Sequence, residues 1–161
     1  MVVNKSYSIP ENATINTINI TAKAQFERMA EEAKKQGFNI YMASGYRSYA
    51  TQASIYDDSV ARSGQAVADM TTARPGHSEH QTGLAIDVND TDFASTPEAA
   101  WLADHAHEYG FIIRYPQGKE EITGFSYDPR HIRYLGIETA TAIFTSGLTL
   151  EEYLGIDSKY E

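Results

Sequence analysis

Residues 78–87, Ser-Glu-His-Gln-Thr-Gly-Leu-Ala-Ile-Asp, decide the fold class and indicate where a site lies. Gly83 can turn the chain because it has no Cβ atom. After it, aliphatic residues recur at every second position up to Val88, which predicts a strand with one aliphatic face. Asp87 then faces away from that side, and a carboxylate on a core strand needs a partner. His80, across the turn, can supply one, together with a metal ion held between the two side chains.

The rest of the chain places helices early and late and joins its later strands by short loops. Apolar spacing predicts helices over residues 21–36, 49–63 and 97–109, and a capping box at Thr149 predicts a short last helix. Further strands are predicted over residues 38–43, 111–114, 122–127 and 131–135. This order favours the α+β class, with a mostly antiparallel central sheet and flanking helices. We expect a single domain over residues 21–161, with residues 1–20 as an extension packed on it.

Composition restricts the function further. The chain has 161 residues, 42% of them hydrophobic, which fits one domain with a proper core. Its formal charge of -9 opposes binding to nucleic acid or to an anionic membrane, so we expect a small-molecule or peptide partner. We also expect a monomer. The absence of cysteine excludes disulfides, thiolate zinc sites and cysteine nucleophiles. No apolar run is long enough for a signal peptide or a membrane span; if the protein is exported, its leader lies outside this chain.

The five histidines can be eliminated one at a time as ligands of a catalytic zinc, which takes three protein ligands and a water. His105 and His107 lie two apart on a predicted helix, about 200° around its axis, so they cannot chelate together. His105 shares a stripe with Trp101, which predicts a packed core histidine. His77 precedes the turn and is expected to make a loop hydrogen bond. His131 remains as the third candidate.

His131 opens a predicted strand, and Asp128-Pro129-Arg130 precede it. Pro129 fixes the backbone there, so Asp128 and His131 can share a rigid bend and point into one cleft, one as ligand and the other as base. The spacing also leaves a second interpretation open. In it, His80 and Asp87 form a buried hydrogen-bonded pair and His131 is a separate surface histidine.

Three segments in the same order resemble the VanY-type D-alanyl-D-alanine carboxypeptidases. They are Ser-Gly-Tyr-Arg-Ser-Tyr (44–49), Arg-Pro-Gly-His-Ser-Glu-His-Gln-Thr-Gly-Leu-Ala-Ile-Asp-Val (74–88) and Glu-Ile-Thr-Gly-Phe-Ser-Tyr-Asp-Pro-Arg-His-Ile-Arg-Tyr-Leu-Gly (121–136). The family belongs to a zinc peptidase group that also contains VanX dipeptidases, L,D-carboxypeptidases and phage endolysin endopeptidases. The resemblance runs from about residue 3 to residue 153 and implies a cleft with one zinc ion bound by His80, Asp87 and His131.

The resemblance also implies roles for four further residues. Asp128 would be the catalytic carboxylate that takes a proton from the zinc-bound water and passes it to the leaving amine. Arg47 would reach over the zinc and stabilise the developing oxyanion; the alternative is an ion pair with an acidic side chain. Ser78 and Gln52 would contact the substrate. Their alternatives are an N-cap role for Ser78 and a solvated helix position for Gln52.

The chain departs from the family pattern at two positions. VanY-type members usually carry glutamate where this chain has Asp128, and an aromatic residue where it has Arg130. Aspartate keeps the carboxylate but is one methylene shorter, and endopeptidase branches of the group use aspartate at this place. Arg130 could offer a cation to an acidic substrate, or it could be a surface arginine.

The function that the resemblance implies is a zinc-dependent D,D-carboxypeptidase that removes the terminal D-alanine from peptidoglycan stem peptides. Within the same group, the alternatives are an L,D-carboxypeptidase and an endopeptidase that cuts within the stem. A rival of another class is a non-catalytic module that binds wall peptides. The substrate implies a place of action on the extracellular face of the bacterial cell envelope, with the cytoplasm as the alternative.

Overall fold

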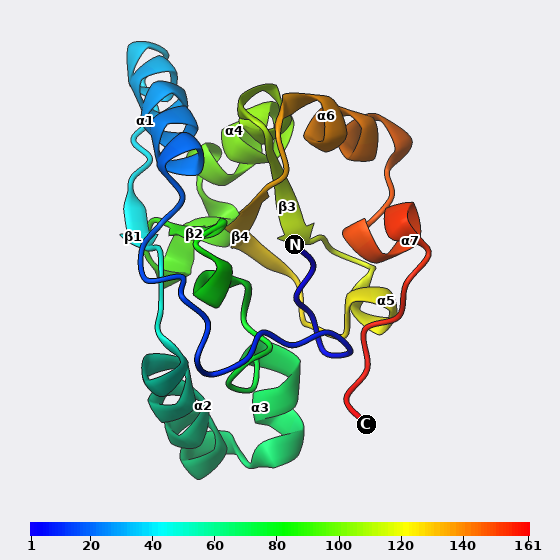
Figure 1. Ribbon diagram of the computed structural model, residues 1–161. Helices are drawn as coiled ribbons and strands as arrows, with labels where there is room; N and C mark the ends of the chain where they lie inside the picture. The colour runs from blue at the N-terminus through cyan, green and yellow to red at the C-terminus, as the bar shows by residue number, and fades with distance from the viewer.

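A four-stranded antiparallel sheet lies at the centre of the computed structural model, which describes the backbone of residues 1–161 and every side chain except that of Thr91 (Figure 1). Its strand order is β1-β2-β4-β3. The strands are β1 (Met42–Ser44), β2 (Ala85–Val88), β3 (Phe111–Tyr115) and β4 (Asp128–Tyr134). The predicted α+β class with an antiparallel sheet is therefore confirmed.

Helices flank the sheet at both of its ends (Figure 1). Toward the top of the view lie α1 (Ile20–Lys35), α4 (Pro97–His105) and α6 (Ile137–Ser146), and at the bottom lie α2 (Tyr49–Ser63) and α3 (Gln65–Thr71). Two short helices, α5 (Glu120–Thr123) and α7 (Leu150–Leu154), lie near the C-terminus. Single 3-10 turns are η1 (Glu79–Thr82), η2 (Thr91–Ser95) and η3 (Ala106–Tyr109). Among the described helices, none combines the length and the apolar character needed to cross a membrane.

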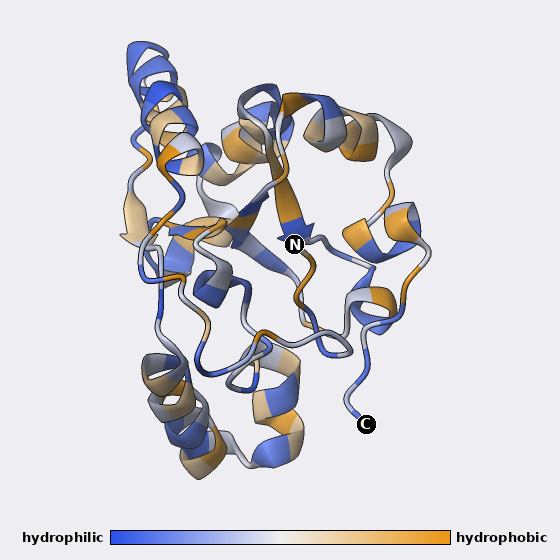
Figure 2. Ribbon diagram, in the orientation of Figure 1, coloured by the Kyte–Doolittle hydropathy of each residue, from blue (hydrophilic) through white to orange (hydrophobic). Residues whose placement is uncertain are grey.

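The main core lies between the sheet and the helices α1 and α4. The predicted apolar stripe of α1 is buried, and Phe26 meets Phe111 of β3 edge to face with ring centroids 6.4 Å apart. Asn19 caps the helix by accepting hydrogen bonds from two backbone N–H groups of its first turn. Figure 2 shows hydrophobic residues along β3, which contributes Phe111 to this core.

Residues 122–127 do not form the predicted strand. Residues 120–123 form the short helix α5, and Glu120 and Glu121 suit the positive end of its dipole. Gly124, in the left-handed conformation, ends the helix, and the Thr123 hydroxyl then accepts a hydrogen bond from the Phe125 N–H at 3.3 Å. These local bonds outweigh the alternating apolar pattern.

Other boundaries also differ from the expectation. The strand predicted over residues 38–43 is shorter and begins only at Met42. The helix predicted over residues 97–109 divides into α4 and η3. The helices α3 and α6 were not predicted. Both begin after a glycine, and no side-chain cap marks where they start.

The turn at Gly83 brings η1 back over the start of β2. Gly83 has φ 70°, and a side chain there would collide with the backbone of Thr17. The carbonyl oxygen of Gly83 also accepts a hydrogen bond from the Asn19 N–H at 2.8 Å. In the antiparallel pairing that follows, Asp87 of β2 lies directly opposite His131 of β4. The turn and the register together gather the candidate ligands.

Candidate metal centre and active-site cleft

Three side chains converge where η1, β2 and β4 meet. The ligand atoms that His80, Asp87 and His131 can offer all lie within 4.8 Å of one another. Asp87 Oδ1 is 3.2 Å from His80 Nε2 and 3.3 Å from His131 Nδ1. His131 is buried, so the interpretation of it as a separate surface histidine is wrong.

Each imidazole of this cluster is fixed through its other nitrogen. His80 Nδ1 lies 2.6 Å from the carbonyl oxygen of Gly45, and His131 Nε2 lies 3.1 Å from Glu79 Oε2. When these nitrogens donate, His80 Nε2 and His131 Nδ1 keep their lone pairs for the cluster. Two imidazole nitrogens and one carboxylate are a donor set that zinc accepts, with a fourth position left for water. The residues present therefore fit a catalytic zinc ion.

The electrostatics of the cluster favour a cation. Burial would raise the pKa of Asp87, but His80 and His131 hold it well below its usual range. Burial lowers the pKa of His80. Burial also opposes charge on His131, yet the hydrogen-bonded carboxylates of Asp87 and Glu79 outweigh it and raise the pKa of His131 to about 9. In the metal-free protein a proton therefore sits between two carboxylates, and a metal ion must displace it.

Arg47 lies on the outer oxygen of Asp87. Its Nη2 donates to Asp87 Oδ2 at 2.6 Å and its Nε donates to Ser44 Oγ at 3.0 Å. Its backbone N–H donates to the His80 carbonyl oxygen at 3.1 Å, which ties the loop before α2 to η1. Arg47 therefore forms the ion pair that was its alternative role, with Asp87 as the partner. It also lines the cleft.

Asp128 lines the same cleft, which has a volume of about 330 Å³. It is the first residue of β4 and pairs with Tyr115 across a register shift that leaves Pro129 and Arg130 as a bulge. The expected bend is this bulge inside the strand. Asp128 Oδ1 accepts a hydrogen bond from the Arg130 N–H at 2.9 Å, which fixes the carboxylate on the bulge.

Ser78 and Gln52 are both buried in the wall of the cleft. Ser78 Oγ accepts a hydrogen bond from the His80 N–H at 3.3 Å, so its N-cap role for η1 is present. Gln52 is 1% exposed, and the interpretation of it as a solvated helix position is wrong. Its Nε2 donates to the Ala73 carbonyl oxygen at 2.8 Å, whereas its buried Oε1 has no hydrogen-bond partner among the described residues. Buried acceptors are usually paired with a donor, and ordered water or a ligand can supply one here.

Arg130 is half-buried rather than a free surface arginine. Its Nε donates to the carbonyl oxygens of Val88 and Asn89 at 3.2 and 3.1 Å, and its Nη2 donates to Asn89 at 2.7 Å. These bonds tie the bulge of β4 to the end of β2. Because carbonyl groups do not neutralise a guanidinium, Arg130 brings positive charge to the cleft that it lines.

Two residues of the site were not predicted from the sequence. Glu79, next to His80, holds the buried side of His131, and its signal was the presence of arginines at 114 and 133 in otherwise apolar strands, which need a carboxylate. Tyr115 lines the cleft and packs on His131 with ring centroids 4.9 Å apart. Burial raises the pKa of Tyr115 well above its usual value, so its hydroxyl stays a hydrogen-bond donor.

The remaining histidines lie outside the cluster. The loop hydrogen bond predicted for His77 is confirmed, with Nδ1 2.9 Å from the Asn4 carbonyl oxygen. The core position predicted for His105 is wrong, because its side chain is 36% exposed and only one face packs on Trp101, at 4.7 Å between ring centroids. His107 stacks on Phe144 instead.

Comparisons with known proteins agree with this geometry. The sequence profile of VanY, described as D-alanyl-D-alanine carboxypeptidase, matches residues 16–137. The putative carboxypeptidase YodJ of Bacillus subtilis (strain 168) is 40% identical over 161 residues, which cover 95% of this chain and 59% of YodJ. The chain therefore spans about three fifths of that relative.

Two solved structures share the whole fold. The LD-carboxypeptidase LdcB has a TM-score of 0.91 and 44% identity, covering 99% of this chain and 88% of that one. A variant of the D,D-pentapeptidase VanY in complex with Zn(II) has a TM-score of 0.87 and 38% identity, covering 96% and 97%. The zinc of that relative and the donor set found here identify zinc as the cofactor. Because the profile, the relatives and the donor set agree, the chain belongs to the VanY family of D-alanyl-D-alanine carboxypeptidases.

Proposed function

We propose that the chain is a zinc-dependent carboxypeptidase that removes the terminal D-alanine from peptidoglycan stem peptides, with preference for the D-alanyl-D-alanine end of pentapeptides. The observation that carries this proposal is one cleft lined by the metal cluster, by Asp128 and by Arg47. A solved relative, VanYB, in complex with D-alanine-D-alanine supports the substrate class; it has a TM-score of 0.87 and 37% identity.

The chain's own residues supply the proton transfers and the charge stabilisation. A zinc ion held by His80, Asp87 and His131 would act as a Lewis acid and lower the pKa of a bound water. Asp128, fixed through Oδ1 by the Arg130 N–H, takes a proton from the attacking water through its other oxygen and gives it to the leaving amine. Arg47, held by Asp87 and Ser44, offers its remaining N–H groups to the developing oxyanion.

We further propose that four side chains of the cleft bind the peptide. Gln52 Oε1, a buried acceptor without a partner among the described residues, accepts an N–H of the peptide backbone. Ser78 and the neutral hydroxyl of Tyr115 offer polar contacts beside the metal cluster. Arg130 attracts a carboxylate of the stem peptide.

One observation favours a second candidate of the same class. The LD-carboxypeptidase LdcB is 44% identical to this chain, whereas the D,D-pentapeptidase VanY is 38% identical. An L,D-carboxypeptidase would release the same D-alanine, but from a tetrapeptide, in which the preceding residue has the L configuration.

A product assay with matched peptides separates these functions. The zinc-loaded chain is incubated with a stem tetrapeptide and with the pentapeptide that has one more D-alanine, and the products are identified by mass spectrometry. We expect one D-alanine to be released from the pentapeptide at a higher rate than from the tetrapeptide. The Asp128→Asn variant should release none. A higher rate on the tetrapeptide would establish the L,D activity. Internal cleavage would indicate an endopeptidase, and binding without any cleavage would indicate a non-catalytic module.

We also propose how the chain is organised and where it acts. Residues 21–161 form the catalytic domain, and residues 1–20 form an extension that packs on it through Val3 and Ile9, which are both buried. We propose that the chain acts as a monomer at the bacterial cell envelope, where its substrate lies. Sedimentation of the purified chain would test the monomer.

A further inference from the structure

Four charged side chains are buried behind the metal cluster, on the side away from the cleft. Glu79, Arg114, Glu151 and Arg133 have side chains that are at most 2% exposed. Arg114 donates from Nε to Glu79 Oε1 at 2.8 Å, and from Nη1 and Nη2 to the two oxygens of Glu151 at 2.8 and 2.5 Å. Arg133 Nη1 donates to Glu79 Oε1 at 2.9 Å. We call these four residues the buried charge network.

The network reaches the metal cluster through one oxygen. Glu79 Oε1 accepts from both arginines, so Glu79 Oε2 is left for His131 Nε2 at 3.1 Å. The position of that oxygen fixes the plane of the imidazole and leaves Nδ1 turned toward Asp87. A change that lets Arg114 shift removes one of the two donors that hold Glu79 Oε1 and so loosens the carboxylate that orients His131.

The network also joins both ends of the chain. Glu151 belongs to α7, and its Oε1 accepts a hydrogen bond from Asn4 Nδ2 at 3.0 Å. The same Asn4 amide donates to the Asp157 carbonyl oxygen at 3.0 Å, and Arg133 Nη2 donates to the carbonyl oxygen of Met1 at 2.5 Å. The first residues and the last helix therefore supply the outer partners of the network.

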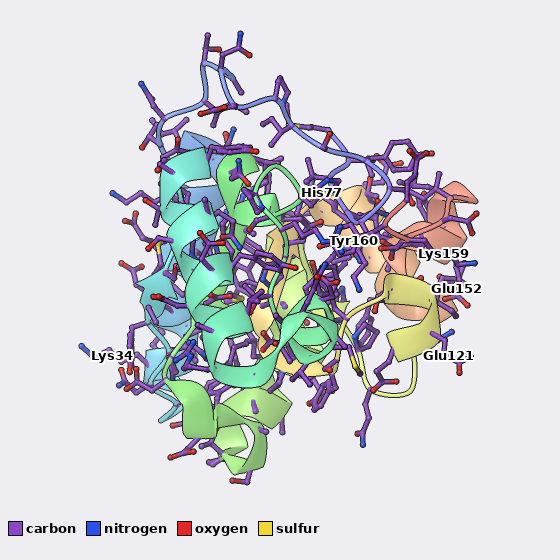
Figure 3. The ribbon with its side chains drawn as sticks, turned by 90° about the horizontal axis from the view of Figure 1, so that it is seen from below. Lys34, His77, Glu121, Glu152, Lys159 and Tyr160 are labelled. Atoms are coloured by element: carbon purple, nitrogen blue, oxygen red, sulfur yellow. The ribbon has the colours of Figure 1, made fainter. Side chains whose placement is uncertain are left out.

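Contacts outside the network hold the same two segments together. The Ser6 hydroxyl lies between the N–H and the carbonyl group of Lys159, at 2.9 and 3.1 Å. Tyr160 meets His77 edge to face with ring centroids 5.2 Å apart, and Figure 3 shows the two side chains beside each other. The His77 ring in turn contacts the Asn4 carbonyl oxygen. The ends of the chain thus close over the loop that leads into η1.

We propose that Glu151 and Asn4 are positioning residues for the metal centre: acting through Arg114 and Glu79, they fix the ring of His131, so that the two ends of the chain set the zinc affinity of the cleft. A buried ion pair is not required for stability, since hydrophobic residues of similar volume often replace one without loss. The network is therefore better explained by the imidazole that it orients than by folding alone. This inference rests on the proposed zinc ligands but not on the proposed reaction.

Zinc affinity measured without substrate tests the inference. The metal-free chain competes for zinc with a coloured chelator, and circular dichroism first confirms that each variant is folded. We expect Glu151→Gln to bind zinc about 10-fold more weakly, at the low end of the roughly 10- to 100-fold effect of changing a ligand's partner. The amide keeps the size of the side chain and an oxygen for Asn4, but it loses the charge that holds Arg114. The cobalt-loaded variant should also show a changed visible absorption spectrum, which reports the geometry of the ligands.

The neighbouring residue provides a matched control. Glu152→Gln removes an ion pair with Lys119 at 2.9 Å and keeps an oxygen for the capping box of α7, so it takes the same charge from the same helix without touching the network. We expect the zinc affinity of this variant to equal that of the original chain. An equal loss in both variants would show that α7 acts only by stabilising the fold and would overturn the inference.

A double-mutant comparison tests the route. If Glu151 acts through Glu79, then Glu151→Gln should have no further effect on zinc affinity in a Glu79→Gln background. Asn4→Ala, a milder change that is expected to weaken zinc binding a few-fold, decides the question if Glu151→Gln does not fold. Unchanged affinity in the folded variants, or fully additive losses, would overturn the inference. If the original chain binds no zinc, the proposed function fails. If the original chain binds zinc and the variants bind it equally well, only this inference fails, so the two failures are distinguishable.

Discussion

Two carboxylates hold the same imidazole from opposite sides, and they differ in almost every other respect. Asp87 meets His131 Nδ1 from the cleft, has a side chain that is 13% exposed, and shares its oxygens with His80 and Arg47. Glu79 meets His131 Nε2 from the interior, with a side chain that is 0% exposed. The cleft carboxylate is available to a metal ion, whereas the interior carboxylate is closed in by arginines. One imidazole ring therefore links the cleft side of the site to its buried side.

The largest expected effect is the loss of the cleft carboxylate. Asp87→Asn should weaken zinc binding by more than the roughly 10- to 100-fold expected for changes outside the ligand set, and should abolish peptide cleavage. The metal-free variant should still fold, because Asp87 is at the edge of the cleft rather than in the core. Zinc titration and thermal unfolding measure both parts.

Asp90→Asn is the control for that change, since Asp90 is an exposed carboxylate just after β2. It should leave zinc binding intact. If Asp87→Asn still bound zinc as tightly as the original chain, Asp87 would not be a zinc ligand and the ligand assignment would be wrong.

The loss of the interior carboxylate should lower stability as well as disturb the metal centre. Glu79→Gln leaves Arg114 and Arg133 buried with one carboxylate fewer, and breaking a buried charge pair in this way costs about 3–5 kcal/mol of unfolding free energy. Urea unfolding of the metal-free protein measures it. Glu121→Gln, at an exposed position, should change the unfolding free energy by less than about 0.5 kcal/mol. A loss for Glu79→Gln no larger than that for Asp87→Asn would remove the distinction between the two carboxylates.

The role of Asp87 in the cleft could be predicted from the sequence more readily than that of the buried Glu79. His80 and Asp87 are joined by a local turn, and the alternating pattern up to Val88 indicates which face of the strand carries the carboxylate. His131 remained after the other histidines had been eliminated, and the structure places it opposite Asp87 in the antiparallel pairing. The residues themselves supported these three as candidates, and the matched motifs supplied their roles.

The surroundings of Glu79 depend on tertiary packing, which the hydrophobic periodicity of the sequence does not predict. Whether Glu79 meets the arginines at 114 and 133 is set by how β3, β4 and η1 pack, and no spacing rule connects these positions. The same holds for Gln52, whose burial comes from a contact with the loop at Ala73. The strand predicted over residues 122–127 failed for the opposite reason, since a left-handed glycine and the Thr123 hydroxyl decided the local structure.

The arginine on the cleft side should affect catalysis more than folding. Arg47→Met removes the donor that we propose for the reacting carbonyl group and releases the outer oxygen of Asp87. We expect kcat to fall by about two to three orders of magnitude, as for other donors of this kind, with a smaller effect on KM. Steady-state kinetics on the stem peptides measure it.

Arg62→Met, on an exposed part of α2, is the control and should leave kcat unchanged. If Arg47→Met lowered stability as much as Glu79→Gln and left kcat intact, Arg47 would stabilise the fold and would not act in catalysis. Its position over Asp87 would then be structural.

The smallest effect is on how the unfolding free energy falls at acidic pH. Asp87 and Glu79 should contribute to this fall in the same way. Burial opposes the charge of both, but their cationic partners hold the pKa of Asp87 and of Glu79 below the usual range in the folded, metal-free protein. Stability from such groups is present above the pKa of the unfolded chain, about 4, and is lost as the pH falls below it. His131 adds no slope there: its pKa of about 9 means that it is protonated in both states, and its own contribution is lost only as the pH rises toward 9.

Each of the two carboxylates should therefore contribute about 1 kcal/mol to the fall in unfolding free energy between pH 4 and pH 3, and the slope should approach about 1.4 kcal/mol per pH unit at lower pH. Asp87→Asn and Glu79→Gln should each make that slope shallower, by an amount that approaches one proton as the pH falls below the pKa of the unfolded chain. Urea unfolding at closely spaced pH values measures the slopes. A slope that changed in only one variant would show that the other carboxylate has an ordinary pKa in the folded protein, and that His131 is held by charge from one side alone.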